Sequence, residues 1–400
     1  MKQTLVEKKR TTAVTAQCGV LVAGGGIAGI AAALAAARHG ADVLLVEREC
    51  LLGGLATLGL VTIYLPLCDG MGNQVSFGIA EELLRLAIRH GAEAKNPAAW
   101  LKNGSLEERK KQRFEVQYNP HLFALEAERL LLGAGVNILY NTVVCATAVR
   151  RKKITHVIVE NKGGRSAIET GAVVDATGDA DICHLSGEQT VCFGRGNTLA
   201  SWYYHFADGQ IHLNLLGGAE EIAGKKTDAD GARRFSGLDG FENSEMLCLS
   251  HGQTLRHILK RRETSPGYVP SVLPSIPQLR MTRRLAGART MDESERGKSH
   301  PDGIGAVGNW RQPGPVYEIP FSTLHGNTIQ NLAAAGRCIS VTDPLWDITR
   351  AIPACAVTGQ AAGTAAAMTN HFAKLDVQIL RAALMRDGAR FLQQGVTRHE

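Results

Sequence analysis

Three glycines near the N-terminus have the spacing of a nucleotide-binding loop. Gly24, Gly26 and Gly29 follow a short β-type run in the register G-x-G-x-x-G, and an Ala-rich segment comes after them. In such a loop the first glycine permits a tight turn, the second lets the backbone approach a pyrophosphate, and the third lets helix and strand pack closely. Free N–H groups at the start of the helix then face the phosphates. The pattern predicts a dinucleotide site that also includes Ile27 and Ala28.

An acidic residue follows this loop at the distance that a ribose contact requires. Gly40 ends the Ala-rich segment, and residues 41–47 form a second β-type run that finishes in Glu47, roughly twenty residues past the glycines. We therefore expect Glu47 to accept hydrogen bonds from ribose hydroxyls. A plain βαβ unit with a glycine-rich turn is the alternative, and it does not account for the register and Glu47 together.

The residues after Glu47 indicate which dinucleotide is bound. Arg48 is followed by the glycine pair Gly53 and Gly54 and then by Thr57. Glycines suit a place where the chain passes close to the pyrophosphate and ribityl part of a cofactor longer than NAD. This order favours FAD. A second G-x-G-x-x-G match at residues 303–308 lies among prolines with no apolar helix after it, so we expect loop and strand edge there.

The elements that must position these residues follow an α/β pattern. Asn119 and Pro120 are typical of a helix N-cap and first helical residue, and the helix they begin runs to about residue 132. From 142 to 176 short β-type runs alternate with turn clusters, as in a β-meander. The other expected elements are strands at 20–22, 41–47, 136–144 and 172–178 and a helix at 30–38.

Composition and charge exclude several classes of protein. The net charge of +6 is a mild excess spread along 400 residues, which argues against a nucleic-acid partner. The nine cysteines include no C-x-x-C pair and no metal-ligand spacing, so we expect no metal and a reducing compartment, the cytoplasm. The basic N-terminus before an apolar stretch imitates a signal peptide or membrane span, but three glycines interrupt the stretch, and we expect no membrane span.

Taken together, these residues resemble a known group, the flavoproteins of the glutathione-reductase structural class, and within it the FAD-dependent oxidoreductase family. The resemblance covers about residues 18 to 370. It is carried by the glycine loop, Glu47-Arg48 with Gly53-Gly54, the stretch Asp175-Ala-Thr-Gly-Asp179, the stretch 331–340 and the stretch 350–355. It implies a Rossmann-type FAD/NAD(P)-binding domain with a parallel sheet and β-meander, an inserted mixed α+β capping domain, and FAD as cofactor.

The resemblance also implies roles for single positions. Ala176, Thr177 and Gly178 are expected to pass near the FAD, and Val144 to bring backbone to the adenine. Gly336 and Arg337 are expected along the ribityl chain. The match is looser at residues 279–287 and 302–308, where the family places the segment that caps the flavin ring.

A helix is expected at the reactive end of the cofactor. Pro353 suits the first helical residue of the segment 354–368, whose N-terminus points at the flavin pyrimidine edge by the same resemblance. A positive helix end stabilises an adjacent negative charge by roughly 0.3–1 kcal/mol. Gly359 and Gly363 form a G-x-x-x-G pair, for which we expect close packing inside a soluble domain rather than pairing of membrane helices.

Candidates for contact with the substrate are few. Arg283 and Arg350 are the proposed catalytic residues, as anchors for a substrate, and Arg284 is an alternative to Arg283. For each a structural ion pair is the competing interpretation. His205 and His325 are candidate proton donors, with a structural histidine the better interpretation of both.

The sequence thus predicts an FAD-dependent oxidoreductase that moves hydride or electrons between flavin and a small organic substrate. The alternatives are a flavoprotein subunit fed by a protein electron carrier and a non-catalytic flavin-binding protein. No redox-active cysteine pair and no second well-placed fingerprint is present, which disfavours a disulfide reductase. The expected domains are 17–185 and 325–372 for FAD, 186–324 for the cap, and a helical tail at 373–400.

Overall fold

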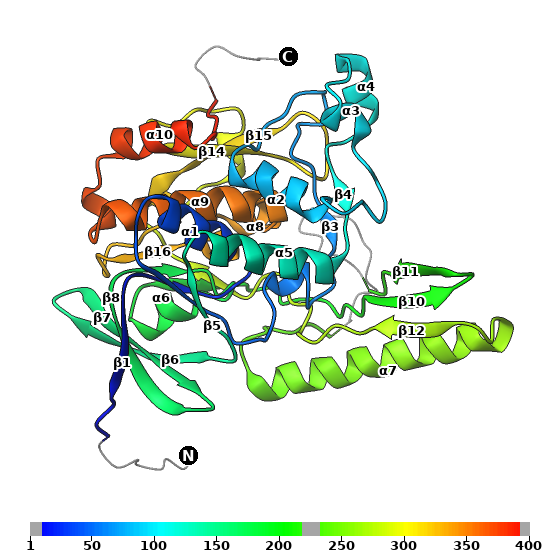
Figure 1. Cartoon of the computed structure of the whole chain (residues 1–400), viewed down its shortest axis with the longest axis horizontal. Coiled ribbons are helices and arrows are strands. Elements are labelled where there is room, and N and C mark those ends of the chain that lie inside the picture. The colour runs from blue at the N-terminus through cyan, green and yellow to red at the C-terminus, as the bar shows by residue number, and fades with distance from the viewer. Residues whose placement is uncertain (1–9, 218–232, 393–400) are drawn as a thin grey trace.

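A mostly parallel sheet forms the centre of the molecule in the computed structural model, which describes residues 10–217 and 233–392 (Figure 1). Within these residues the strand order is β5-β2-β1-β8-β7-β6, with β16 paired to β8. The strands are β1 Val14–Ala23, β2 Val43–Val46, β5 Asn137–Leu139, β6 Val143–Arg150, β7 Lys153–Asn161, β8 Gly164–Asp175 and β16 Leu332–Ala334. The pairs of β1 with β2 and β8, of β2 with β5, and of β8 with β16 are parallel. The predicted α/β class is confirmed.

One long strand joins the β-meander to the parallel sheet. The first half of β8 pairs antiparallel with β7, and its second half pairs in parallel with β16. The last strand of the meander and the strand expected at 172–178 are therefore one continuous strand, β8. The single strand expected at 136–144 is also wrong, because Asn141 takes φ +49° and separates β5 from β6. Asn tolerates this left-handed conformation better than most residues.

Two nearly buried helices pack face to face beside this sheet. They are α1 Ile27–Arg38 and α9 Ile352–Met368. A Cβ at Gly359 would stand 2.3 Å from the Ala28 carbonyl oxygen, and one at Gly363 would stand 2.0 Å from that of Ala32. The glycine pair thus lets the two backbones touch, and the expected packing role is confirmed.

The remaining helices lie around this centre. Asn119 caps α5 Pro120–Gly133 by accepting hydrogen bonds from the N–H groups of His121 and Leu122, as predicted. The expected C-terminal helix is α10 Val377–Arg386, while residues 393–400 of the predicted tail lie outside the described residues. The other helices are α2 Ile79–Ala87, α3 Ala98–Leu101, α4 Leu106–Lys111, α6 Asp181–Leu185 and α8 Asp343–Thr349.

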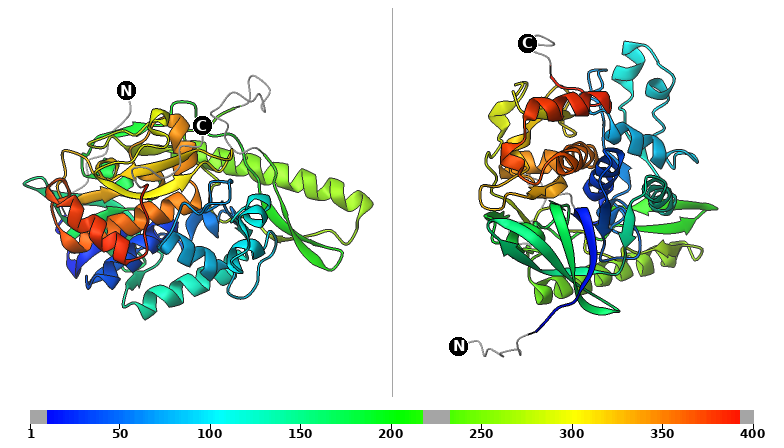
Figure 2. Two further views of the ribbon diagram at one scale, coloured as in Figure 1. Left: turned by 90° about the horizontal axis from the view of Figure 1, so that it is seen from above. Right: turned by 60° about the vertical axis from the view of Figure 1, so that its left-hand side comes forward.

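An arm projects from one side of the molecule (Figures 1 and 2). It consists of α7 Gly240–Thr264 and a sheet of β10 Tyr203–Ala207, β11 Gln210–Asn214 and β12 Val269–Val272. Three two-stranded sheets complete the described strands: β3 Ile63–Tyr64 with β4 Val116–Gln117, β9 Thr190–Cys192 with β13 Arg283–Leu285, and β14 Gly303–Gly308 with β15 Val316–Pro320. The second glycine match is therefore a strand, β14.

The described residues hold no disulfide, no cluster of metal ligands and no helix suited to a membrane. All nine cysteines lie in the described residues, and each is free. Within the described ranges no group of His, Cys, Asp and Glu has the arrangement of a metal site. Among the helices of residues 10–217 and 233–392, none is both long and apolar enough to cross a membrane.

Candidate active site

A cavity of about 480 Å³ opens where the parallel strands end, a volume in the range of small-molecule sites. The glycine loop, the strand ends, the N-terminus of α9 and the segment 276–280 enclose it. The predicted cofactor residues that line it are Gly24, Gly26, Ile27, Ala28, Glu47, Arg48, Gly53, Gly54, Val144, Ala176, Thr177, Gly178 and Arg337. The predicted residues that do not line it are Gly29, Thr57 and Gly336.

The three glycines of the loop have different structural roles. Gly24 has φ +98°, and a Cβ there would meet the Ala176 carbonyl oxygen at 2.5 Å. A Cβ at Gly29 would stand 1.8 Å from the Gly24 carbonyl oxygen, so Gly29 serves the packing of α1 on the loop. A Cβ at Gly26 would meet nothing within 4 Å. Gly26 therefore presents bare backbone to open space, which fits a group of pyrophosphate size.

The second glycine pair is bonded directly to the first loop. The Gly53 N–H donates to the Gly25 carbonyl oxygen at 2.8 Å, and Gly53 forms a β-bridge with Gly26. Thr57 lies behind the pair: its hydroxyl donates to the Leu52 carbonyl oxygen at 2.6 Å, and its methyl group fills the space beside Gly53. Thr57 thus supports the cavity wall rather than forming it.

Glu47 is buried and holds two backbone groups. Its Oε2 accepts from the Gly25 N–H at 2.5 Å, and its Oε1 accepts from the Glu49 N–H at 2.9 Å. Burial raises the pKa of Glu47, while these two hydrogen bonds act in the opposite direction. Each carboxylate oxygen accepts more than one hydrogen bond, so hydroxyl donors from a ribose can still be accommodated.

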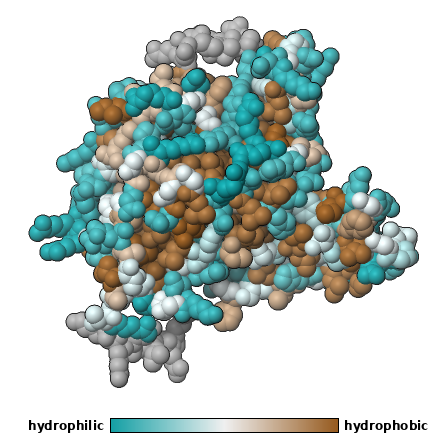
Figure 3. Space-filling model, viewed as in Figure 1, coloured by the Kyte–Doolittle hydropathy of each residue, from teal (hydrophilic) through white to brown (hydrophobic). Residues whose placement is uncertain are grey.

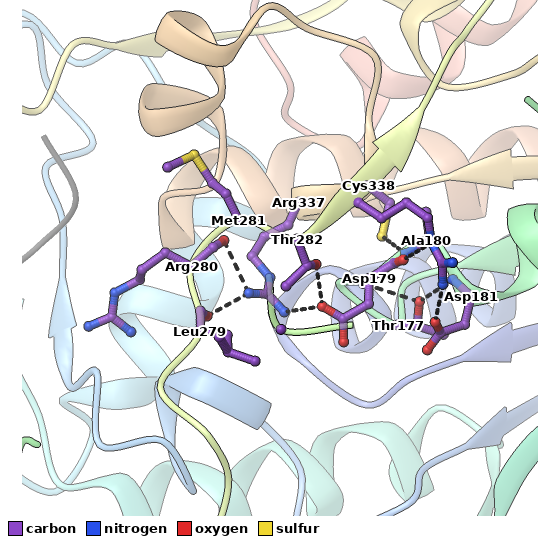
Figure 4. A network of polar contacts seen from close by, with 12 residues as sticks. Thr177, Asp179, Ala180, Asp181, Leu279, Arg280, Met281, Thr282, Arg337 and Cys338 are labelled. Carbon is purple, nitrogen blue, oxygen red and sulfur yellow. Dashed lines mark hydrogen bonds and ion pairs between the residues drawn. The ribbon is translucent and has the colours of Figure 1, made fainter. Parts of the chain in front are cut away.

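Arg337 links the sheet to the capping segment (Figure 4). Its guanidinium donates to the carbonyl oxygens of Leu279, at 2.7 Å, and Arg280, at 3.1 Å. It also pairs with Asp179 at 3.4 Å, and Asp179 accepts from the Thr282 hydroxyl at 2.6 Å. The neighbouring Gly336 does not line the cavity and donates its N–H to the Thr358 hydroxyl at 2.9 Å. This network fixes one side of the cavity against the other.

The N-terminus of α9 reaches the cavity without a side-chain cap. Ala351, Ile352 and Cys355 line the wall there. An uncapped helix start leaves N–H groups able to face a negative charge. Burial raises the pKa of Cys355 to about 12, so its side chain is a neutral thiol at neutral pH.

The candidate substrate arginines lie in different places. Arg350 lines the cavity and is held by Asp347, which accepts from its Nε at 3.0 Å. Arg283 does not line it: its guanidinium is bound by the Asp181 carboxylate at 2.7 Å and the Asp179 carbonyl oxygen at 2.9 Å. Arg284 is buried, 3.7 Å from Asp343 and stacked over Trp346.

The two candidate histidines lie away from the cavity wall. His205 is buried in the arm, where its ring stacks on Tyr268 with centroids 4.1 Å apart. His325 is buried, with Nδ1 3.2 Å from the Gly326 carbonyl oxygen. Both have the structural surroundings that the competing interpretation predicted.

One wall of the cavity was not predicted from the sequence. It consists of apolar side chains at every second position from just before β3 to just after it, together with apolar residues of the capping segment. The first group is Val61, Ile63 and Leu65, and the second is Ile276, Pro277 and Leu279. The alternation at 61, 63 and 65 is the signal of a half-buried strand and was available in the sequence. The residues near 276 carry no such signal.

Asp181 gives the site a pH-dependent charge. Burial raises the pKa of this carboxyl to about 6, with Asp179 and Asp175 adding repulsion and Arg283 opposing it. Because the pKa of an unfolded Asp is about 3.9, Asp181 stabilises the fold fully below that value, and this contribution is lost as the pH rises through 6. We expect urea midpoints of the apoprotein to fall more between about pH 4 and 7 in the wild type than in Asp181→Asn. Equal slopes for the two proteins would contradict the assignment.

Comparison with known families found one family that matches most of the chain. The model of the family described as FAD dependent oxidoreductase matches residues 19–202 and 222–384. A comparison with the sequences of curated proteins found no match.

Solved structures similar to the chain have low sequence identity. A geranylgeranyl bacteriochlorophyll reductase-like protein from Thermoplasma acidophilum is 14% identical, with 93% of this chain and 82% of that chain covered and a TM-score of 0.42. The p-nitrophenol 4-monooxygenase PnpA from Pseudomonas putida DLL-E4 is 10% identical, with coverages of 93% and 85% and a TM-score of 0.46. THI4 from Thermovibrio ammonificans is 15% identical with a TM-score of 0.31, and the match spans 44% of this chain and 64%, less than two thirds, of THI4.

Proposed function

This chain belongs to the FAD-dependent oxidoreductase family, and we propose from this premise that the cavity beside the glycine loop holds FAD and an organic substrate. The backbone at Gly26 would contact the pyrophosphate, and Glu47 the ribose. Val144 would lie by the adenine, and Arg337 by the ribityl chain. The single observation that carries the proposal is the open space at Gly26, bounded by the second glycine pair.

Bound FAD supplies the hydride or electron transfer, so the protein must position the substrate and balance charge. The uncapped start of α9 is suited to the second task, since a helix N-terminus favours negative charge by roughly 0.3–1 kcal/mol, and by more when partly buried. The apolar wall from β3 and the segment 276–279 is suited to excluding water. Together they describe a site for a substrate with substantial apolar surface.

We propose Arg350 as the anchor for an anionic group of that substrate. It lines the cavity at the start of α9, and Asp347 fixes its guanidinium from the other side. Arg283 would act indirectly, because it binds the Asp181 carboxylate and the backbone of the turn at Asp179 rather than the substrate. The domain boundaries 17–185, 186–324, 325–372 and 373–400 remain our proposal, and the cytoplasm remains the proposed location.

Replacing Arg350 by glutamine removes the charge but keeps hydrogen-bonding capacity. A hydrogen bond to a charged group contributes about 1.5–3 kcal/mol, so we expect a rise of roughly tenfold to a hundredfold in the half-saturating concentration of an anionic substrate. The Arg350→Lys variant should recover part of the loss. Equal half-saturating concentrations of an anionic substrate in all three proteins would contradict this role of Arg350.

The function is tested by an absorption spectrum of the purified protein, repeated on the supernatant after denaturation. Release of FAD is the expected result. Anaerobic titration with NADH, NADPH and a panel of small acids, alcohols and amines then identifies the donor class by bleaching. Bleaching by none of these compounds would favour a protein electron carrier, and failure to bind added FAD would overturn the proposal.

A further inference from the structure

The arm helix α7 carries an apolar seam on its outer face. Its inner face packs on the arm sheet and the body through the buried residues Met246, Ser250, Thr254 and Ile258. The outer face bears the apolar side chains of Phe241, Leu255 and Leu259. With Cys248, Gly252 and the ion-paired Glu245 they form a stripe of six residues that we call the α7 seam. Phe241 is 91% exposed, and Leu255 and Leu259 are each 56% exposed. Figure 3 shows apolar surface on the arm among polar residues.

The α7 seam has the heptad spacing of helices that pair as coiled coils. Its members follow one another at alternating intervals of four and three residues over most of the 25 residues of α7. This 3.5-residue repeat keeps one stripe facing a partner helix along its whole length. Gly252 lies in the middle of the stripe, and a Cβ there would approach only the guanidinium of Arg256. The centre of the seam therefore allows another helix to come close.

The charges along α7 favour a second copy of the chain as the partner. The N-terminal end carries Asp239, Glu242 and Glu245, of which Glu242 is bound by Ser236 and Glu245 is paired with Arg233. The C-terminal end carries Arg256, Lys260, Arg261 and Arg262 with one acid, Glu263, and Arg261 lies over the Tyr268 ring. Two copies of α7 packed antiparallel bring each acidic end against a basic end, whereas two parallel copies bring like charges together. Such a pairing is self-complementary under a two-fold axis, as the interface of a symmetric dimer must be.

We propose that the chain forms a homodimer through antiparallel pairing of the α7 seam. Centring the pair on residue 250 places Phe241 of one copy against Leu259 of the other, Cys248 against Gly252, and Glu245 against Leu255. A membrane surface is a poorer occupant, because Phe241, the most exposed apolar residue of the seam, lies between Asp239 and Glu242, which an anionic bilayer would repel. The C-terminal part of α7 projects beyond the body, while its N-terminal part lies against the body (Figures 1 and 2).

The association is tested on the full chain by sedimentation over a concentration series. We expect a dimer, and we expect Leu255→Glu with Leu259→Glu to raise its dissociation constant by at least about tenfold. Ile379→Glu is the matched control, since Ile379 is 58% exposed on α10, away from the arm, and this variant should remain a dimer. A wild type that stays monomeric, or that instead co-sediments with anionic phospholipid vesicles, would overturn the proposal.

The orientation is tested by disulfide trapping. Gly252→Cys is expected to give a covalent dimer under mild oxidation, with peptide mapping showing a bond between positions 248 and 252 of different copies. Adding Cys248→Ser should abolish this bond. A parallel pair would behave differently, since it would link 252 to 252 and keep the covalent dimer in the double variant. Bond formation between 252 and 252, or none at all in Gly252→Cys, would overturn the antiparallel arrangement.

Discussion

A Gly26→Val variant is expected to fold but to lose its flavin. The backbone at Gly26 is in the extended region, with φ −67° and ψ −177°, and a Cβ there meets nothing within 4 Å, so the apoprotein has room for the new side chain. Valine is a poorer N-cap than glycine, which costs about 1 kcal/mol of stability. In the holoprotein the isopropyl group would occupy the space of the pyrophosphate. We expect affinity for FAD to fall at least about a hundredfold, a cost of about 3 kcal/mol.

The measurement is flavin occupancy by absorption together with the urea midpoint of the apoprotein. Gly29→Ala is the contrasting variant, since its Cβ would stand 1.8 Å from the Gly24 carbonyl oxygen and would disturb the fold itself. Glu47→Ala should weaken binding to a smaller extent, because it removes the proposed ribose contact and two hydrogen bonds that hold the loop. Unchanged occupancy in both Gly26→Val and Glu47→Ala would contradict the site.

The parts of the site that local patterns predict are those whose partners are close along the chain, whereas the lining residues at 144, 176–178 and 337 were expected from the family resemblance. The register of Gly24 and Gly29 has a largely local cause, because Gly24 has φ +98° and Gly29 lies against the Gly24 carbonyl oxygen. The same is true of the cap at Asn119. The break at Asn141 was missed because a residue with positive φ leaves only a weak signal when it is not glycine.

Which of the candidate residues lie at the cavity depends on tertiary contacts that no local sequence pattern reveals. Arg283 and Arg350 both stand near suitable motifs, yet only Arg350 lines the cavity, since Asp181 binds the guanidinium of Arg283. Asp181 is 102 residues away from Arg283, and no local pattern connects the two. Arg337 likewise links residues remote in sequence, since it is 158 residues from Asp179 and 58 from Leu279. Such pairs become visible only when the sheet and the cap are placed together.

The second large effect is expected from Gly363→Val in the middle of α9. Its Cβ would stand 2.0 Å from the Ala32 carbonyl oxygen and 2.7 Å from two further backbone atoms of Ala32. No side-chain rotamer relieves a clash of the Cβ atom itself, so α1 and α9 must separate. We expect a loss of about 3 kcal/mol or more in the free energy of unfolding, because overpacking a filled core costs about 1–3 kcal/mol even where it can be relieved.

The matched control is Gly133→Ala in α5. A Cβ at Gly133 would meet nothing within 4 Å, so this change should stabilise the chain by at most about 1 kcal/mol through helix propensity alone. Urea unfolding of both variants separates propensity from packing. Because α1 carries Ile27 and Ala28 into the cavity, separation of the helices in Gly363→Val should also lower flavin occupancy. A Gly363→Val protein as stable as the wild type would mean that α1 and α9 do not touch backbone to backbone.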